Sequence, residues 1–378
     1  MSIVTRRPAP PAQTRLQAAR LDWVLIFAAA ALSMIGCVLI ASAGIGAGDG
    51  TGAARRQAVA TLLAIVVAYA VTRVEPRSLR AWTPALYGVS LLGLLLPFTP
   101  AGVSIAGARA WVELPLGFTV QPSEFAKLAL ICALASTLAV GDRSGLVPDR
   151  VVVRALALAG IPVVIVLIGN DTGTAMIMTG IVAVVMLVAG VSWRWLVGLA
   201  AAAVAVAVAA VGLGLLADYQ MQRLMSFLDP TADPYGAGLN TLQARIAVGS
   251  GGVVGRGLMD GPQTQGGFVP VNDSDFVFSV AAEELGLVGG LLVIGLLATL
   301  VWRALRIAFD APDMFGRLIA VGVATWFAVQ GFENIGMNLG VMPVTGVTLP
   351  FVSYGGSSMI AAWLGIGLLQ LVRLRSSR

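Results

Sequence analysis

Four carboxylates flank a short apolar run in the C-terminal third of the chain. The stretch "VPVNDSDFVFSVAAEELG", residues 269–286, places Asp273 and Asp275 before this run and Glu283 and Glu284 after it. The last two lie about two helical turns further on, where at least one is expected to pair with an arginine or with backbone donors. The chain has no histidine, which excludes a Ser-His-Asp triad and an imidazole-bound zinc site. Acid–base chemistry must therefore use carboxylates, the single lysine or a tyrosine.

Membrane helices must position these carboxylates, because the composition is that of a membrane protein. The 378 residues are 58% hydrophobic and only 11% charged, whereas about 25% of residues are charged in soluble domains. Apolar runs of about 20 residues, long enough to cross a bilayer as a helix, occur ten times. We predict an all-α, polytopic membrane protein with about ten transmembrane helices, at residues 22–43, 57–73, 81–98, 121–140, 152–168, 173–190, 195–216, 276–301, 317–340 and 357–372.

A polar tail at residues 1–20 precedes the first span and is rich in Pro, Ala and Arg. We expect this tail to be disordered and cytoplasmic. The first apolar run is too long for a cleavable signal peptide. Residues 21–378 are expected to form a single transmembrane domain, with residues 217–275 as a large loop on the outer side. Two cysteines lie inside spans and are interpreted as buried thiols.

Arginine positions predict the orientation in the membrane. Seventeen arginines lie in segments on one side, and cytoplasmic segments carry the excess of Lys and Arg. Both termini are therefore expected in the cytoplasm, and the net charge of +5 indicates topology and membrane lipids rather than nucleic acid. Six arginines lie on the outer side against this rule, where they bind either lipid headgroups or an anionic ligand: Arg55, Arg56, Arg109, Arg223, Arg245 and Arg256.

The single lysine follows a glutamate on one predicted helix. Glu124 and Lys127, in "QPSEFAKLAL", share a helix face near the outer end of the span at 121–140. Ionisable groups inside a membrane usually face a bundle interior and pair with each other. Two roles stay open for them: a structural ion pair that fixes helix packing, or a direct part in binding or proton transfer.

Two outer segments are expected to have irregular structure. In the long loop at 217–275, the spacing of Leu239, Leu242 and Ile246 predicts a short helix near the interface. Its "GSGGVVGRG" stretch lacks the preceding strand and the Gly-Lys-Ser/Thr of a P-loop, so its glycines are expected to permit tight turns. The Pro- and Gly-rich residues 342–358 predict a re-entrant segment that faces a polar site.

Four long motifs resemble the SEDS (shape, elongation, division and sporulation) family, whose best-known members are RodA of elongation and FtsW of division. They are "QPSEFAKL", "FLDPTADPYGAGLNTLQARIAVGSGG", "GPQTQGGFVPVNDSDFVFSVAAEELG" and "NIGMNLGVMPVTGVTLPFVSYGGSS". The resemblance covers about residues 21–375 and implies a peptidoglycan glycosyltransferase that polymerises lipid II on the outer face of the bacterial cytoplasmic membrane. The last motif is more similar to the elongation member, which implies a role in cell elongation and shape.

The resemblance also implies roles for particular residues. The family's catalytic aspartate, in its "HTDF" motif, falls on Asp275 of "NDSDF", while Asp273 stands where the family often has His. The Glu–Lys pair of the span at 121–140 matches the family's intramembrane ion pair. Trp111 in "GARAWVEL" and Arg56 in "RRQ" match parts of an outer cavity that binds substrate. The implied partner is a class B penicillin-binding protein, the transpeptidase that crosslinks new strands.

The implied reaction needs one general base and positive charge at the leaving group. The GlcNAc 4-hydroxyl of one lipid-linked disaccharide would attack the anomeric carbon of MurNAc in another with inversion, and Asp275 is expected to be the base. Its second interpretation is an N-cap of the helix that follows. The pyrophosphate is expected to bind arginines, with Mg or Mn as a further candidate and no organic cofactor: Arg56, Arg109, Arg223 and Arg245.

Two other classes of function stay open. A lipid II flippase or another transporter is favoured by the intramembrane Glu–Lys pair and by the Pro- and Gly-broken segment before the last span. The sequence shows no internal inverted repeat, and its polar motifs lie mostly on one side, which both count against transport. A non-catalytic scaffold of the cell-wall machinery is the third class, and it would tolerate loss of the Asp275 carboxylate.

Overall fold

The computed structural model describes a bundle of long helices. It covers residues 21–46, 48, 50–105, 107–114, 118–140, 147–214, 218–228 and 238–376. The tail at residues 1–20, expected to be disordered, lies outside the described residues. One cluster of buried apolar side chains continues from Leu25 near the start of the bundle to Val372 near its end.

Long apolar helices occupy all ten predicted spans. Among the described residues, eight helices are long and apolar enough to cross a membrane. The other two, α5 and α7, have 17 residues each, which is the lower end of the length that spans a bilayer. The ten helices are α2 (Trp23–Gly46), α3 (Gly52–Thr72), α4 (Pro76–Leu95), α5 (Pro122–Leu138), α6 (Asp149–Ile168), α7 (Thr172–Val188), α8 (Trp193–Gly212), α13 (Gly286–Asp310), α14 (Met314–Leu339) and α15 (Gly356–Ser376).

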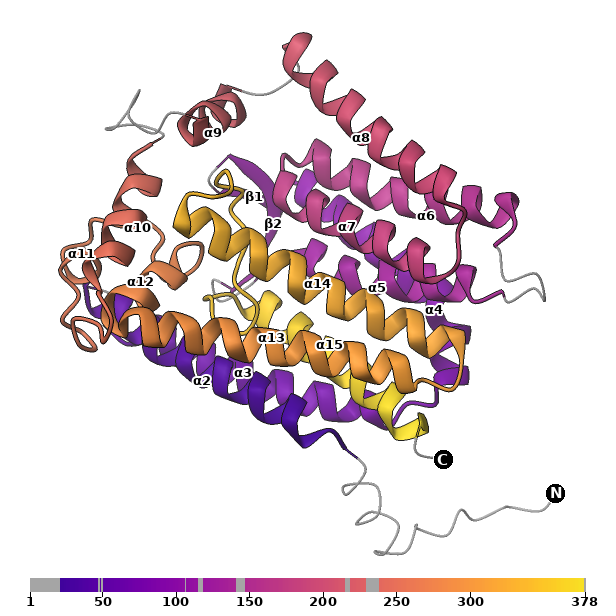
Figure 1. The fold of residues 1–378 in the computed structure, drawn as a ribbon, viewed down its shortest axis with the longest axis horizontal. Helices are drawn as coiled ribbons and strands as arrows, with labels where there is room; N and C mark the ends of the chain where they lie inside the picture. Colours follow the sequence, from indigo (N-terminus) through magenta and orange to yellow (C-terminus); the bar gives the residue numbers. More distant parts are fainter. Residues whose placement is uncertain are drawn as a thin grey trace, which may run out of the picture.

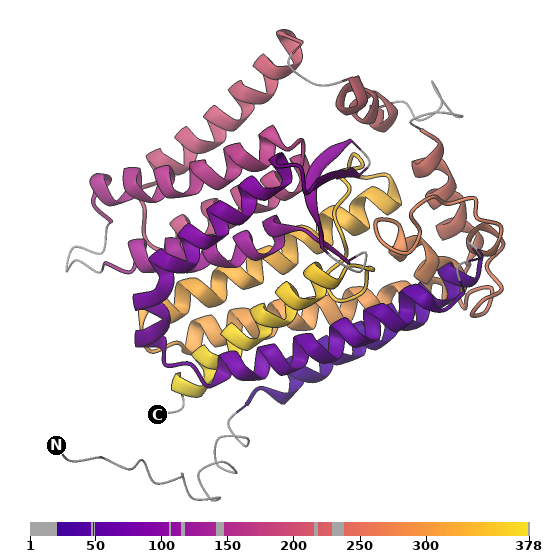
Figure 2. The same cartoon turned by 180° about the vertical axis from the view of Figure 1, so that it is seen from behind.

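The helices run roughly side by side, with α14 in the middle of the bundle (Figures 1 and 2). Helix α14 packs against α13 and α7, and α15 packs against α3. Helix α8 lies at the edge of the bundle (Figure 1), and no residue of its apolar stretch is buried. Four shorter helices gather at one end, whereas α2 begins and α15 ends at the other: α9 (Asp218–Leu228), α10 (Leu239–Ser250), α11 (Pro262–Gln265) and α12 (Val277–Glu284).

The all-α fold class is confirmed, and the structure adds one small sheet after α4. After the short 3-10 helix η1 (Leu96–Phe98), strands β1 (Gly102–Ile105), β2 (Ala108–Leu114) and β3 (Phe118–Val120) form an antiparallel sheet in the order β1-β2-β3. Val103 pairs with Trp111, and the register shifts at the next residue of β1. The segment was too short and too interrupted for alternation of apolar residues to predict strands from the sequence.

The prediction of one continuous helix at 276–301 is corrected, because the structure has two helices there. Helices α12 and α13 meet at Gly286, whose φ of 68° is the left-handed conformation that favours glycine. The outer loop packs into this break: the N–H groups of Leu287 and Val288 donate to the carbonyls of Gly252 and Val253, at 2.9 and 3.2 Å. The loop therefore provides hydrogen bonds that a continuous helix would have formed internally.

The predicted loop structures are present at both outer segments. The helix expected around Leu239 is α10, and the glycines before α11 form turns, with Gly255 and Gly257 at positive φ. A Cβ atom on Gly255 would overlap the Glu284 carbonyl, so this glycine is also required for close backbone approach. Residues 341–355 have no helix or strand although much of the segment is buried, as a re-entrant segment requires.

The break at Gly286 generates a stability prediction. A Cβ atom at Gly286 would lie 2.6 Å from the Val253 carbonyl oxygen, and the left-handed conformation itself costs a non-glycine residue about 1–2 kcal/mol. Gly286→Ala is therefore expected to lower the melting temperature of the detergent-solubilised protein by several degrees. Gly295→Ala on α13 is the matched control, since open space surrounds that position. Equal melting temperatures for the two variants would contradict this account of the helix break.

Candidate active site

Asp275 lies in a tight loop just before α12, at the end of the bundle where the outer segments gather. The N–H groups of Ser274 and Phe276 both donate to the Val271 carbonyl, and Val271 has a φ of 54°. The N-cap of α12 is Phe276, and no side chain of that residue caps the helix. The N-cap interpretation of Asp275 is therefore wrong, because the helix begins one residue later than this role requires.

Two asparagines of α14 hold the backbone of Asp275. The Asn334 and Asn338 amides both donate to the Asp275 carbonyl, at 2.9 and 3.1 Å. Asn338 also accepts a hydrogen bond from the Ser279 N–H in the first turn of α12, at 3.0 Å. Asn338 thus provides the side-chain acceptor for α12 that the sequence suggested for Asp275.

The Asp275 side chain is half-buried and lies next to an arginine of α9. A Cβ atom built on Gly346 would be 3.6 Å from Asp275 Oδ2 and 3.8 Å from Arg223 Nη1, so both groups border one point. Burial raises the pKa of Asp275 to about 6, while Arg223 and the Ser274 hydroxyl act in the opposite direction. Two further carboxylates, Asp273 and Asp171, add to the raised pKa.

The re-entrant segment fixes the loop that contains Asp275. The Ser353 hydroxyl donates to the Ser274 carbonyl at 2.5 Å, and the Tyr354 N–H donates to the Asp273 carbonyl at 2.8 Å. Gln57, a fully buried residue of α3, donates to the Ser353 carbonyl at 2.9 Å. These bonds join α3, the re-entrant segment and the loop before α12 into one unit.

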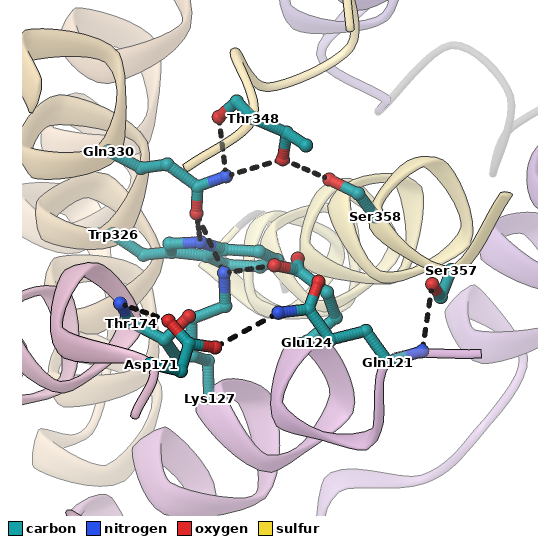
Figure 3. Close-up of polar contacts among 10 residues, drawn as sticks. All are labelled: Gln121, Glu124, Lys127, Asp171, Thr174, Trp326, Gln330, Thr348, Ser357 and Ser358. Atoms are coloured by element: carbon teal, nitrogen blue, oxygen red, sulfur yellow. Dashed lines mark hydrogen bonds and ion pairs between the residues drawn. The ribbon is translucent and has the colours of Figure 1, made fainter. Parts of the chain in front are cut away.

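Lys127 lies in a buried polar network next to this unit (Figure 3). Its Nζ lies 2.8 Å from Glu124 Oε1 and donates to Gln330 Oε1 at 2.7 Å, and neither charged side chain is more than 4% exposed. The Gln330 amide in turn donates to the Thr348 carbonyl of the re-entrant segment at 2.8 Å. Trp326 covers the ammonium group, with 4.8 Å between Nζ and the ring centroid. The ion pair is therefore connected through Gln330 to the same segment that holds the loop before α12.

The structure places the other predicted substrate-binding residues around the same end of the bundle, in different settings. Arg56 of α3 lies over the Tyr354 ring at 5.9 Å, and Arg245 of α10 lies against Gly340, where α14 ends. Arg109 of β2 donates to the Pro97 carbonyl at 2.8 Å, and Trp111 is half-buried on the same strand. Among the four candidate arginines, it is the charge of Arg223 that lowers the pKa of Asp275.

The two glutamates at the end of α12 have structural partners. Glu283 is fully buried and accepts the N–H groups of Gln263 and Thr264 at 2.8 and 2.9 Å, which caps α11. Glu284 accepts the Ser42 hydroxyl of α2. The expectation that one of the pair binds backbone donors is confirmed.

Sequence reasoning missed three polar residues of this centre. Asp171 caps α7 by accepting the Thr174 N–H at 3.0 Å, and it also accepts the Gln121 amide at 3.0 Å (Figure 3). Glu333, which is 2% exposed, and Gln330 lie on α14. An ionisable residue inside an apolar span is a functional signal by itself, so Glu333 in the span at 317–340 could have been found from the sequence.

The prediction of a divalent cation stays a prediction. Within the described part of the chain, no group of three or more His, Cys, Asp or Glu residues could hold a metal ion. The donor set around Asp275 contains one adjacent arginine and two carboxylates that act at longer range.

Fold and site together define a polytopic helical membrane protein whose polar centre lies at one end of the bundle. The family model described as "Cell cycle protein" (FtsW, RodA and SpoVE) matches residues 22–378. A relative from Escherichia coli (strain K12), "Peptidoglycan glycosyltransferase MrdB", is 36% identical over 364 residues, which is 96% of each chain.

Two solved structures are also similar to this one. A chain of a peptidoglycan synthase complex, studied for its coordination of polymerization and crosslinking, has a TM-score of 0.79 and 36% identity, over 95% of this chain and 99% of that one. The crystal structure of the rod shape determining protein RodA from Thermus thermophilus has a TM-score of 0.69 and 33% identity, over 95% of this chain and 98% of that one. The chain belongs to the FtsW/RodA/SpoVE family, the SEDS proteins.

The buried ion pair generates a prediction that separates its two interpretations. Lys127→Met is expected to destabilise the protein by about 3–5 kcal/mol, because Glu124 is left as an uncompensated buried charge. The double variant Glu124→Gln/Lys127→Met removes both charges and is expected to recover most of the lost thermal stability. Glycan polymerisation is measured on the same preparations: recovery of activity with stability indicates a structural pair, whereas a stable but inactive double variant indicates a direct role.

Proposed function

We propose that this protein is a peptidoglycan glycosyltransferase that polymerises lipid II into glycan strands. The observation that carries the proposal is the state of Asp275: its carboxylate does not cap α12, it is partly buried with a raised pKa, and it lies next to Arg223. Such a carboxylate can accept a proton at a position where a cation is also present. Relatives named as peptidoglycan glycosyltransferases support this chemistry.

The proposed reaction is a single displacement with inversion. Asp275 accepts the proton of the GlcNAc 4-hydroxyl as that oxygen bonds to the anomeric carbon of the donor MurNAc. The bond from this carbon to undecaprenyl pyrophosphate breaks, and the leaving group takes the electron pair. A carboxyl pKa of about 6 suits this role, because the group is ionised near neutral pH yet more basic than an exposed aspartate. The mechanism needs no covalent enzyme intermediate.

Arg223 is the side chain best placed to stabilise the leaving pyrophosphate. Its guanidinium and the Asp275 carboxylate border one point beside Gly346, so charge developing on the donor side would find a cation close by. Arg56, Arg109, Arg245 and Trp111 are proposed to bind more distant parts of the two substrates. A divalent cation, Mg or Mn, would have to be held largely by the pyrophosphate oxygens, since the described residues offer no cluster for it.

The orientation proposed is N- and C-termini in the cytoplasm and Asp275 on the outer face of a bacterial cytoplasmic membrane. Arg373 and Arg375 lie in the last turn of α15, and Arg303 pairs with Asp22 just before α2 begins, so this end of the bundle carries arginines, which supports its placement in the cytoplasm. The acyl chain of lipid II would lie among apolar helices, so the substrate enters from the lipid side.

A transpeptidase partner is proposed from the relatives rather than from any surface of this chain. The structure with a TM-score of 0.79 is a chain of a peptidoglycan synthase complex. By analogy, this protein would work with a class B penicillin-binding protein that crosslinks the strands. Its similarity to MrdB and to the rod shape determining protein RodA supports a role in cell elongation and shape.

Loss of the Asp275 carboxylate is the first functional prediction. Asp275→Asn is expected to lower the rate of lipid II polymerisation by about 10²–10⁴, the usual contribution of a general base. Asp260→Asn, which neutralises an exposed carboxylate of the outer loop, is the control and is expected to retain activity. Polymer is measured by gel electrophoresis of labelled product, with the folded fraction matched by gel filtration.

Three outcomes of these experiments would contradict the proposal or its assignment of the base. Full activity of Asp275→Asn would mean that the base lies elsewhere. Movement of labelled lipid II across vesicle membranes, without polymer, would favour the transporter. A wild-type protein that neither polymerises nor transports lipid II, alone or with its transpeptidase, would favour a scaffold.

The raised pKa of Asp275 generates a prediction for pH dependence. Protonated Asp275 cannot accept a proton, and its pKa in the folded protein is raised from 3.8 to about 6. The value of kcat/KM is therefore expected to be lost as pH falls through about 6, approaching tenfold per pH unit. Tryptophan fluorescence at each pH checks that the protein stays folded. An unchanged rate down to pH 5 in folded protein would rule out a base with this pKa.

A further inference from the structure

Asn338 is fully buried, and its side-chain amide bridges three backbone segments. Its Nδ2 donates to the Asp275 carbonyl at 3.1 Å and to the Asn334 carbonyl at 2.8 Å. Its Oδ1 accepts the Ser279 N–H at 3.0 Å. Donor and acceptor are thus both used, and no rotation of the amide preserves this set of bonds.

Asn334 acts beside Asn338 on the same carbonyl. One turn earlier on α14, its Nδ2 donates both to the Asp275 carbonyl at 2.9 Å and to the Val347 carbonyl of the re-entrant segment at 2.8 Å. The two asparagines therefore form a clamp, defined here as Asn334 and Asn338, that holds the backbone of Asp275 from a rigid central helix. A carbonyl with two amide donors has both of its lone pairs satisfied.

The clamp has a consequence for the Asp275 carboxylate. The first turn of a helix carries backbone N–H groups without intrahelical partners, and a nearby carboxylate is a strong acceptor for them. The N-cap of α12, Phe276, provides no side-chain acceptor, and Asp275 directly precedes it in the chain, so its carboxylate is a candidate acceptor for these amides. Asn338 Oδ1 already occupies the Ser279 amide, which the Phe276 carbonyl also accepts at 3.0 Å. The carboxylate is thereby left to face Arg223.

We propose that Asn338 is a positioning residue of the glycosyltransferase site: by capping α12 and holding the Asp275 carbonyl, it keeps the Asp275 carboxylate available as the base. The proposal rests on the proposed function of Asp275. It differs from a packing role, because it concerns where the carboxylate points and how readily it takes a proton. A carboxylate that turns to the α12 amides would be stabilised as an anion and would become a weaker base.

The charged groups that act on Asp275 come from three elements. Arg223 on α9 lowers its pKa, while Asp273 in the same loop and Asp171 at the start of α7 raise it. The Ser274 hydroxyl lowers it through a hydrogen bond. None of these groups is changed by Asn338→Leu, and that substitution adds no charge, so a shift of the pH profile in this variant reports on the carboxylate itself.

Two substitutions of similar size make the test, and they predict opposite shifts. Asn338→Leu removes both the cap and the donor, so the carboxylate is expected to reach the α12 amides. The rate of lipid II polymerisation should fall by about 10- to 100-fold, as small misplacements of a catalytic group can cause. The acid limb of the profile, which is the loss of kcat/KM as pH falls, should move to lower pH. Asn338→Asp keeps an acceptor for Ser279 but adds a like charge near Asp275, so its acid limb should move to higher pH.

The controls are Thr325→Val, which removes a buried hydroxyl from the same helix away from the clamp, and Asp275→Asn. Thr325→Val should keep the wild-type rate and profile. The proposal is overturned if both Asn338 variants keep the wild-type acid limb, with rate losses that follow only their folded fractions.

The results for Asp275→Asn separate this proposal from the proposed function. If Asp275→Asn is inactive and Asn338→Leu behaves like Thr325→Val, the positioning role of Asn338 is wrong, while the proposed polymerase function is supported. If Asp275→Asn is fully active, Asp275 is not the base, and the positioning role of Asn338 is then wrong as well. If Asn338→Leu does not fold, Asn338→Ala takes its place, because it also removes the cap and the donor: a fall of kcat/KM that moves to lower pH supports the clamp, and an unchanged profile contradicts it.

Discussion

Backbone that is not helical can lie inside a membrane bundle only if other groups satisfy its N–H and C=O groups. The site depends on this constraint. Residues 341–355 enter the bundle without helix or strand, and amide side chains of neighbouring helices bind their carbonyls: Gln57 from α3, and Gln330 and Asn334 from α14. Each of these bonds also fixes a helix relative to the segment. The irregular backbone is therefore the element to which the surrounding helices are joined.

Asp275 owes its properties to its place between this segment and α12. The loop that contains it is held on one side by Ser353 and on the other by the clamp of α14, so its position follows from the rigid centre of the bundle. Partial burial of the carboxylate raises its pKa, and Arg223 supplies the opposite charge from a separate outer helix. A base and a cation are thus brought together from elements that are far apart in the sequence. The ion pair of Lys127 is connected to the same irregular segment through Gln330, which binds both Lys127 and the Thr348 carbonyl.

The sequence predicted the parts of this structure that depend on local pattern. Apolar runs located all ten long helices, and the Pro- and Gly-rich stretch before α15 predicted irregular backbone. It could not predict that the apolar run after Asp275 breaks at Gly286, because the break depends on an outer loop that packs there. For the same reason the N-cap interpretation of Asp275 was wrong: the acceptor is Asn338, which lies 59 residues from Ser279 in the chain. Contacts of this kind need tertiary structure.

The stereochemistry of the product tests the central claim most directly. Purified wild-type protein, alone and with a class B penicillin-binding protein whose transpeptidase is inactivated, is given labelled lipid II, and the new linkage is determined by NMR. The account predicts a β-linked glycan made from the α-linked donor, with release of undecaprenyl pyrophosphate, as a single displacement assisted by one base requires. A product that keeps the α configuration, or lipid II that stays unpolymerised in both preparations, would contradict it.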